Sequence, residues 1–253
     1  MEVKMELHER VVEGWQISAE GYSDIINDEL IKDDAVLWTK MLKKLLPKSE
    51  KPLRILDVGT GPGFFAIILS KLGHQVVGID VTQEMVYFAK NNADKEGVAP
   101  LFLQMDSQKL TFPENTFDLI ISRNVVWTLD QPLSAYCNWH KVLKPEGKLI
   151  VFDADYLADI RDEALKTIIE ANRKEYIDLY GKPKVSFEDY EKARGFRVNL
   201  PLADKKRPDW DLEILNQLEF KDFGWQDVSK DVYNEQRFKL YKYQPMFMLW
   251  GIK

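Results

Sequence analysis

The chain has 253 residues, 45% of them hydrophobic and 30% charged, a balance that is typical of one large globular domain and excludes disordered and fibrous proteins. Its 41 acidic and 35 basic side chains give a formal net charge of −6, which argues against a nucleic-acid partner because such binding depends on neutralising phosphates. Cys137 is the single cysteine, so a disulfide framework or a cysteine-rich metal site is excluded and a reducing, cytoplasmic location is expected.

Neither a secretory signal nor a membrane span is expected from the sequence. The first ten residues, MEVKMELHER, are charged throughout, unlike the apolar centre of a signal peptide. The longest apolar runs, such as Phe64–Leu69, are too short to cross a bilayer. We therefore expect no membrane partner, and the choice between a monomer and a homodimer stays open.

The first 50 residues are expected to be helical. Apolar Leu37, Met41 and Leu45 follow one another at four-residue spacing. This spacing predicts a helix that has Asp33 as its cap and ends before Pro47.

From Arg54 onward, short β-rich runs alternate with helical stretches. Strands are predicted over Arg54–Val58, Gln75–Asp80, Leu101–Met105, Phe117–Ser122 and Lys148–Asp153. Helices are predicted over Phe64–Lys71, Gln83–Ala93 and Pro132–Leu143, the last with Asp130 near its cap. Lys144–Gly147 suits a type I turn, with proline second and glycine fourth. The alternation predicts βαβ units, and hence an α/β fold with a parallel sheet and helices on both faces.

The last hundred residues give a weaker pattern. A long helix is predicted from just after Tyr156 to about Tyr180, and residues 181–215, which contain several prolines and glycines, are expected to form an irregular insertion. Two further strands are predicted over Phe220–Val228 and Met246–Ile252. Residues 156–245 contain no motif that indicates a particular chemistry.

The strongest signal is the segment ILDVGTGPG, in which a buried strand runs directly into a glycine-rich turn and a helix. Glycines permit positive φ and close approach of a ligand, and the helix N-terminus lies at the sheet edge where doubly wound folds bind ligands. A dinucleotide fingerprint would need a third glycine where Phe64 stands, and a P-loop would need a Gly-Lys-Ser/Thr ending. Asp57, just before the turn, suits an ammonium group better than a pyrophosphate. A tight turn without a ligand is the plainer alternative.

A second carboxylate, Asp80, ends the next strand, 21 residues after Gly59. An acidic residue at this distance accepts hydrogen bonds from ribose hydroxyls in nucleoside-binding folds. Alone it would be a weak indication, since strands often end in Asp for turn reasons. Together with the glycine turn it predicts a nucleoside site.

Residues 53–155 resemble the core of a class I S-adenosylmethionine-dependent methyltransferase, of the small-molecule branch that includes ubiquinone and menaquinone biosynthesis enzymes. The resemblance rests on LDVGTGPG, GIDVTQEM, QMDSQKLTFPENTFDLIISRNV and WHKVLKPEGKLIVFDAD, in this order. It implies a doubly wound, mostly parallel Rossmann-like sheet of about seven strands with the last one antiparallel. It also implies that residues 1–50 form a helical cap over the cofactor site of a methyltransferase domain at 51–253.

The resemblance assigns cofactor roles to individual positions. S-adenosyl-L-methionine would be the cofactor and S-adenosyl-L-homocysteine the product. The residues implied to hold the methionine part are Tyr22, Asp57, Gly59, Thr60, Gly61, Arg123 and Asn124. Those implied to hold the nucleoside are Asp80, Val81, Met85, Asp106 and Ser107. From the residues alone, Asp106 and Ser107 could equally cap a loop, and Arg123 and Asn124 could lie in a surface turn.

Candidates for the methyl acceptor come from the N-terminal helical segment, from the sheet edge beyond the fourth and fifth strands and from the loop at residues 205–211. They are Trp15, Trp127, Asp153, Tyr156 and Arg207, the last in a short basic run that could form a lid and carry the arginine toward an acidic acceptor. Ordinary packing for the aromatic side chains, a helix cap for Asp153 and a solvated loop for Arg207 are the alternatives. No catalytic residue is assigned, because a general base is needed only if the acceptor must lose a proton.

Three histidines, His8, His74 and His140, show no metal-ligand or triad spacing, so each is expected to be a structural or surface residue and no metal site is predicted. The predicted function is an enzyme that transfers a methyl group from S-adenosylmethionine to a small molecule by in-line displacement. A nicotinamide-dependent oxidoreductase and a non-catalytic S-adenosylmethionine-binding regulator are the alternatives.

Overall fold

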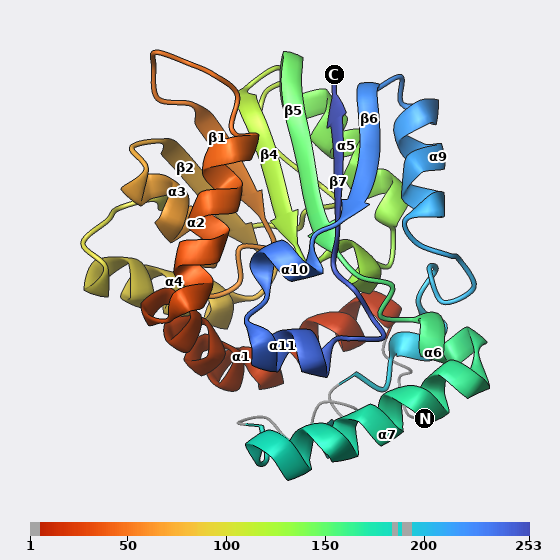
Figure 1. The fold of residues 1–253 in the computed structure, drawn as a ribbon. Helices are drawn as coiled ribbons and strands as arrows, with labels where there is room; N and C mark the ends of the chain where they lie inside the picture. The colour runs from red at the N-terminus through yellow and green to blue at the C-terminus, as the bar shows by residue number, and fades with distance from the viewer. Residues whose placement is uncertain (1–5, 184–186, 189–193) are drawn as a thin grey trace, which may run out of the picture.

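The computed structural model describes residues 6–183, 187–188 and 194–253, and its centre is one seven-stranded sheet (Figure 1). The strand order is β3-β2-β1-β4-β5-β7-β6. In chain order the strands are β1 (Arg54–Val58), β2 (Gln75–Asp80), β3 (Leu101–Gln104), β4 (Phe117–Arg123), β5 (Leu143–Asp153), β6 (Lys221–Asp227) and β7 (Phe247–Ile252). Strands β1 to β5 are parallel, and β7 runs antiparallel to both β5 and β6. The predicted fold class is confirmed.

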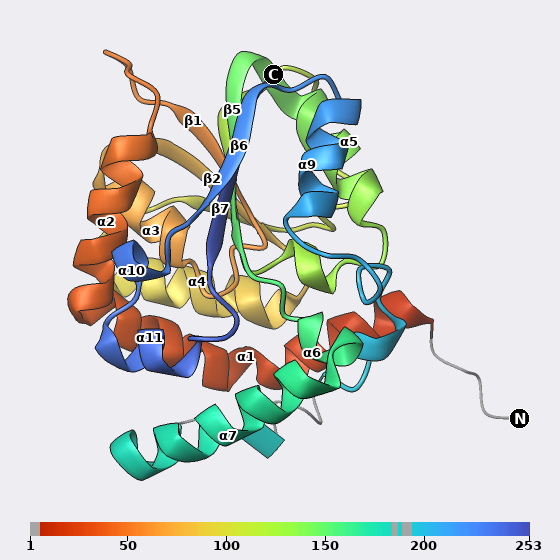
Figure 2. The ribbon, with the colours of Figure 1, turned by 45° about the vertical axis from the view of Figure 1, so that its right-hand side comes forward.

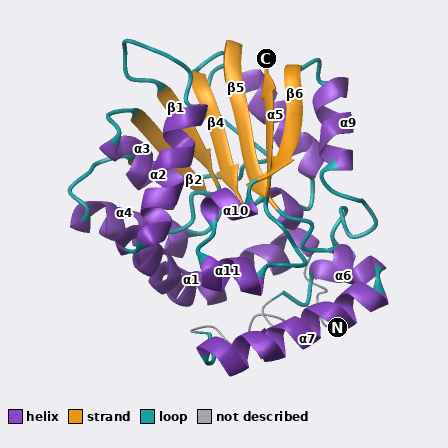
Figure 3. Cartoon of the chain, in the orientation of Figure 1, coloured by secondary structure: helices purple, strands orange, loops and turns teal. Residues whose placement is uncertain are grey.

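Helices cover both faces of the sheet, as Figures 2 and 3 show. Against one face pack α2 (Asp33–Leu45), α3 (Phe64–Lys71) and α10 (Ser229–Val232), and against the other pack α5 (Pro132–Val142) and α9 (Asp209–Gln217). The central strands are apolar on both sides because both sides are covered. Leu56 of β1, for example, joins the cluster of α5 and α9, whereas Ile55 joins that of α2 and α3.

The remaining helices gather at the edge where the parallel strands end. They are α1 (Leu7–Ile31), α6 (Ala158–Arg161), α7 (Glu163–Tyr180) and α11 (Glu235–Leu240). The exception is α4 (Gln83–Lys95), which packs against the same face as α2 and α3 through Val86, Ala89 and Ala93. Figures 1 and 2 both place α1, α6, α7 and α11 across this edge. Among the described residues, no helix combines the length and apolar character needed to cross a membrane.

Two local predictions were wrong. Glu146 has φ of 60°, which excludes a type I turn at Lys144–Gly147, because that turn needs negative φ at its third residue. Asp33 is the first residue of α2 rather than its cap. Asp130 lies next to Gln131, the N-cap of α5, as predicted, and its carboxylate accepts hydrogen bonds from His8 and Gln108.

Part of the predicted irregular insertion is regular. Within residues 181–215, positions 184–186 and 189–193 lie outside the described residues, but α9 begins at Asp209 and a short 3-10 helix covers Arg197–Asn199. The short helices α10 and α11 were not predicted, because four to six residues show too little of the helical period to be recognised.

Candidate functional site

The glycine turn after β1 has the backbone that the sequence predicts. Gly59, Gly61 and Gly63 have φ of 62°, 52° and 95°, a region in which side chains are strained. A Cβ atom on Gly59 would lie 2.3 Å from Cγ2 of Val125, in the loop after β4. The turn is therefore built for close approach between two loops at the carboxyl edge of the sheet.

Asp57 stabilises this turn through hydrogen bonds to its carboxylate. Its Oδ2 accepts hydrogen bonds from Oγ1 of Thr60 at 2.6 Å and from the backbone N–H of Ala66 at 3.0 Å. Burial disfavours the charged form and raises the pKa of Asp57 to about 7, although both hydrogen bonds oppose the rise. A cation beside Asp57 would favour its ionised form.

Asp80 joins the end of β2 to the same turn. Its Oδ2 accepts from the N–H of Gly61 at 3.0 Å, and its Oδ1 accepts from the N–H and the hydroxyl of Thr82 at 3.0 and 3.1 Å. Burial raises the pKa of Asp80 despite these bonds. The carboxylate is thus fixed at the edge where β1 and β2 end side by side.

One pocket collects most of the predicted cofactor residues. It encloses about 700 Å³ of empty space, part of it open to solvent, beneath α1 and above the carboxyl edge. The predicted residues that line it are Trp15, Tyr22, Gly59, Gly61, Asp80, Val81, Met85, Asp106, Ser107, Arg123 and Asn124. Asp57 and Thr60 line a smaller cavity of about 270 Å³, which shares Tyr22, Gly59, Gly61 and Arg123 with the first.

Arg123 is held by the C-terminal half of α1. Its guanidinium donates to Glu29 at 2.8 Å and lies 4.2 Å over the ring of Phe64. Glu29 is buried, yet Arg123 and Arg237 on α11 outweigh the cost of burial and lower its pKa. Arg123 therefore remains charged and fixed in the wall of both cavities.

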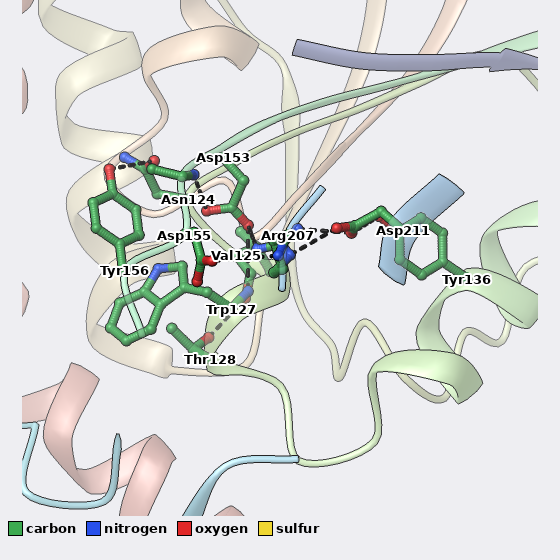
Figure 4. A network of polar contacts seen from close by, with 11 residues as sticks. Asn124, Val125, Trp127, Thr128, Tyr136, Asp153, Asp155, Tyr156, Arg207 and Asp211 are labelled. Carbon is green, nitrogen blue, oxygen red and sulfur yellow. Dashed lines mark hydrogen bonds and ion pairs between the residues drawn. The ribbon is translucent and has the colours of Figure 1, made fainter. Parts of the chain in front are cut away.

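The aromatic acceptor candidates form a row beside the pocket. The ring centroids of Trp15 and Trp127 are 6.3 Å apart, and those of Trp127 and Tyr156 are 5.4 Å apart. The Tyr156 hydroxyl donates to Oδ1 of Asn124 at 3.1 Å (Figure 4). Trp15 reaches the pocket wall, whereas Trp127 and Tyr156 are buried behind it.

Arg207 does not extend toward an acceptor. Figure 4 shows its guanidinium between two carboxylates, Asp153 at 2.7 Å and Asp211 at 2.8 Å. The side chains of all three are at most 1% exposed, and Tyr136 donates a further hydrogen bond to Asp211. The prediction of a lid arginine was therefore wrong, since these ion pairs bury Arg207. Asp153, in turn, accepts from the backbone N–H of Trp127 at 3.3 Å.

Sequence reasoning missed one histidine of the pocket. His8 lines it and its Nδ1 lies 2.8 Å from Oδ1 of Asp130, a residue 122 positions away that carries no local signal. The other two histidines lie elsewhere: His74 accepts from the N–H of Leu53, and His140 packs on Phe220. Across the residues that the structure describes, no group of three or more His, Cys, Asp or Glu could hold a metal ion.

Comparison with known proteins agrees with this geometry. Residues 56–151 match the family described as "Methyltransferase domain". A demethylmenaquinone methyltransferase from Thermus thermophilus is 32% identical over 132 residues, which cover 51% of this chain and 60% of that protein. The matched segments cover between 31% and 61% of the lengths of the curated relatives.

Solved structures share the fold at low identity. An S-adenosylmethionine-dependent methyltransferase from Aquifex aeolicus has a TM-score of 0.56 and 21% identity, covering 91% of this chain and 97% of its own. A Haemonchus contortus phosphoethanolamine N-methyltransferase, in complex with phosphomonomethylethanolamine and S-adenosylhomocysteine, has a TM-score of 0.59 and 17% identity, covering 85% of this chain and 52% of its own.

Residues 56–151 are thus similar in sequence to class I S-adenosylmethionine-dependent methyltransferase domains, and the chain as a whole shares the fold of solved enzymes of this class. S-adenosylmethionine is the cofactor of this class.

Proposed function

We propose that the chain is an enzyme that transfers a methyl group from S-adenosylmethionine to a small-molecule acceptor by in-line displacement. The observation that carries this proposal is the glycine turn with positive φ, which lines the main pocket. Asp57 and Asp80, at the ends of two neighbouring strands, both accept hydrogen bonds from this turn. This arrangement supplies close backbone approach and fixed carboxylates, which a ligand with ribose hydroxyls and an ammonium group requires.

In this proposal, residues of the chain hold each part of the cofactor. Asp80 would accept from the ribose hydroxyls, and Asp106 would accept from the adenine amino group. Tyr22 and Arg123, which meet at the smaller cavity, would hold the methionine carboxylate. When bound, the cofactor supplies an electrophilic methyl group on a sulfonium centre.

The acceptor would meet that methyl group beneath α1. In this proposal residues 1–50 are a cap over the cofactor site, and the protein supplies position and a dry cavity. A general base is needed only for an acceptor that must lose a proton. Trp15 at the wall, backed by Trp127 and Tyr156, would present apolar surface to a small molecule. The phosphoethanolamine enzyme among the structural neighbours supports a small acceptor. We propose a cytoplasmic location, consistent with a single cysteine.

The alternative cofactor, a nicotinamide dinucleotide, is not favoured. Its fingerprint needs a glycine where Phe64 stands, and Phe64 is buried under Trp38 and Arg123. A regulator would bind S-adenosylmethionine but transfer no methyl group, so a measurement of turnover distinguishes it from an enzyme.

The test has two stages. Calorimetric titration with S-adenosylhomocysteine, beside NADH and ATP, is expected to give one-to-one binding of the first ligand alone. Conversion of S-adenosylmethionine to S-adenosylhomocysteine is then measured with small amines, thiols, phenols and quinols as acceptors. Binding of NADH instead would refute the cofactor assignment, and cofactor binding without turnover on any acceptor would favour the regulator.

A further inference from the structure

The wall of the main pocket holds a polar cluster of which the proposed function uses only Asp106. It consists of Asp106, Gln108, Asp130 and His8, all of which line the pocket. Three of them follow β3 or β4, whereas His8 comes from the first turn of α1. The cluster therefore joins the helix above the pocket to the loops below it.

Gln108 fixes the centre of this cluster. Its Nε2 donates to Oδ1 of Asp106 at 3.2 Å and to Oδ1 of Asp130 at 2.9 Å. Its Oε1 accepts from the backbone N–H of Gln131 at 2.6 Å. Gln108 is 2% exposed, and both the nitrogen and the oxygen of its amide are hydrogen-bonded. The amide orientation is therefore fixed, and it holds the two carboxylates in place.

Asp130 in turn holds His8. The same Oδ1 lies 2.8 Å from Nδ1 of His8, and the Asp130 side chain is 12% exposed against 35% for the imidazole. Burial would raise the pKa of Asp130, but the hydrogen bonds from His8 and Gln108 outweigh it and lower the pKa. The carboxylate is thus a charged acceptor, and it fixes the imidazole at the edge of the pocket.

The position of His8 on α1 indicates which end of the pocket it closes. His8, Trp15 and Tyr22 are seven residues apart, so they share one helix face, and all three line the pocket. From His8 to Tyr22 the helix rises about 21 Å, at about 1.5 Å per residue. Tyr22 lies at Gly61, beside the glycine turn, so His8 lies at the opposite end, next to Gln108 and Asp106.

We propose that His8 is a further cofactor-binding residue: held by Asp130, it closes the pocket over the adenine end of the nucleoside and slows its release. This inference rests on the proposed function, because it takes Asp106 as the partner of the adenine amino group. Asp130 acts through His8 as a positioning residue, and Gln108 aligns both with Asp106.

The experiment compares two ligands, S-adenosylhomocysteine and 5′-methylthioadenosine, which share the nucleoside and differ in the amino-acid part. His8→Ala and Asp130→Asn are each expected to lower the affinity for both ligands about tenfold, through faster dissociation. The double variant should bind no more weakly than either single one, because the two residues act as one unit. His74→Ala, at a histidine far from the pocket, is the matched control and should bind normally.

Three results would overturn the inference. They are unchanged affinity in both single variants, a loss confined to S-adenosylhomocysteine, and losses that add up in the double variant. The melting temperature of each ligand-free variant separates binding from folding, since a purely structural pair would destabilise the empty protein and leave the dissociation rate unchanged. If the unaltered protein binds neither ligand, the proposed function itself is refuted. If it binds both ligands and the variants bind them with the same affinity, only the role of His8 is refuted.

Discussion

Replacing Asp80 by alanine tests the nucleoside assignment most directly. In the variant the ribose hydroxyls would lose the carboxylate that accepts their hydrogen bonds. Hydrogen bonds to a charged acceptor contribute about 1.5–3 kcal/mol. At about 1.4 kcal/mol per factor of ten, the affinity for S-adenosylhomocysteine should fall about 10- to 150-fold. The lower figure is a minimum, because the N–H of Gly61 also loses its acceptor and the glycine turn is then less firmly held.

Calorimetric titration at constant pH and salt measures this loss. Asp118→Asn is the matched control: this carboxylate near the start of β4 binds Lys144 and the N–H of Arg54, at the opposite edge of the sheet. The control should leave the affinity unchanged. If Asp80→Ala binds S-adenosylhomocysteine within twofold of the unaltered protein, Asp80 does not contact the ribose.

Three further outcomes concern Asp57, Arg207 and His140. Because burial raises the pKa of Asp57 from 3.8 to about 7, the folded protein keeps a proton that the unfolded chain has released. The empty protein should therefore lose stability as the pH rises from about 4 to 7, and the affinity for S-adenosylhomocysteine, whose ammonium favours the ionised form, should rise between pH 6 and 8. Asp57→Asn should weaken both trends in urea unfolding and calorimetry, and part of the stability trend should remain because burial also raises the pKa of Asp80. Arg207→Ala leaves two buried carboxylates without a cation and should cost about 3–5 kcal/mol in urea unfolding, whereas an effect below 1 kcal/mol would contradict the buried ion pairs. His140→Ala removes a ring that packs on Phe220, away from the pocket, so the affinity for S-adenosylhomocysteine should stay within twofold.

The sequence was informative wherever a local pattern determines the structure. The bounds of β1, α3 and β2 were predicted to the residue, because apolar runs, glycines and terminal aspartates are read over a few neighbouring positions. Most cofactor candidates were predicted for a related reason: the carboxyl ends of parallel strands meet at one edge, and all candidates except Tyr22 on α1 lie at or shortly after such an end.

Contacts between distant segments were not predictable in this way. Glu29 and Arg123 are 94 positions apart, and His8 and Asp130 are 122 apart. A single sequence carries no signal of which residues will meet over such a separation. For Arg207 a local pattern was misleading. A short basic run normally indicates a solvated loop, but Asp153 and Asp211 pair with this arginine and compensate for the burial of its charge.

The position of β7 has a consequence for how the chain folds. Although Phe247–Ile252 follows β5 and β6 in the sequence, it lies between them, and β6 pairs with the sheet through β7. During synthesis β6 leaves the ribosome before its partner and has to wait for it, while the apolar edge of β5 stays open. We expect a chain shortened before Phe247 to aggregate, since β5 would then present unpaired backbone groups along Leu149–Phe152 to any neighbouring strand. Completion of the sheet is therefore a late event, tied to the arrival of its last strand.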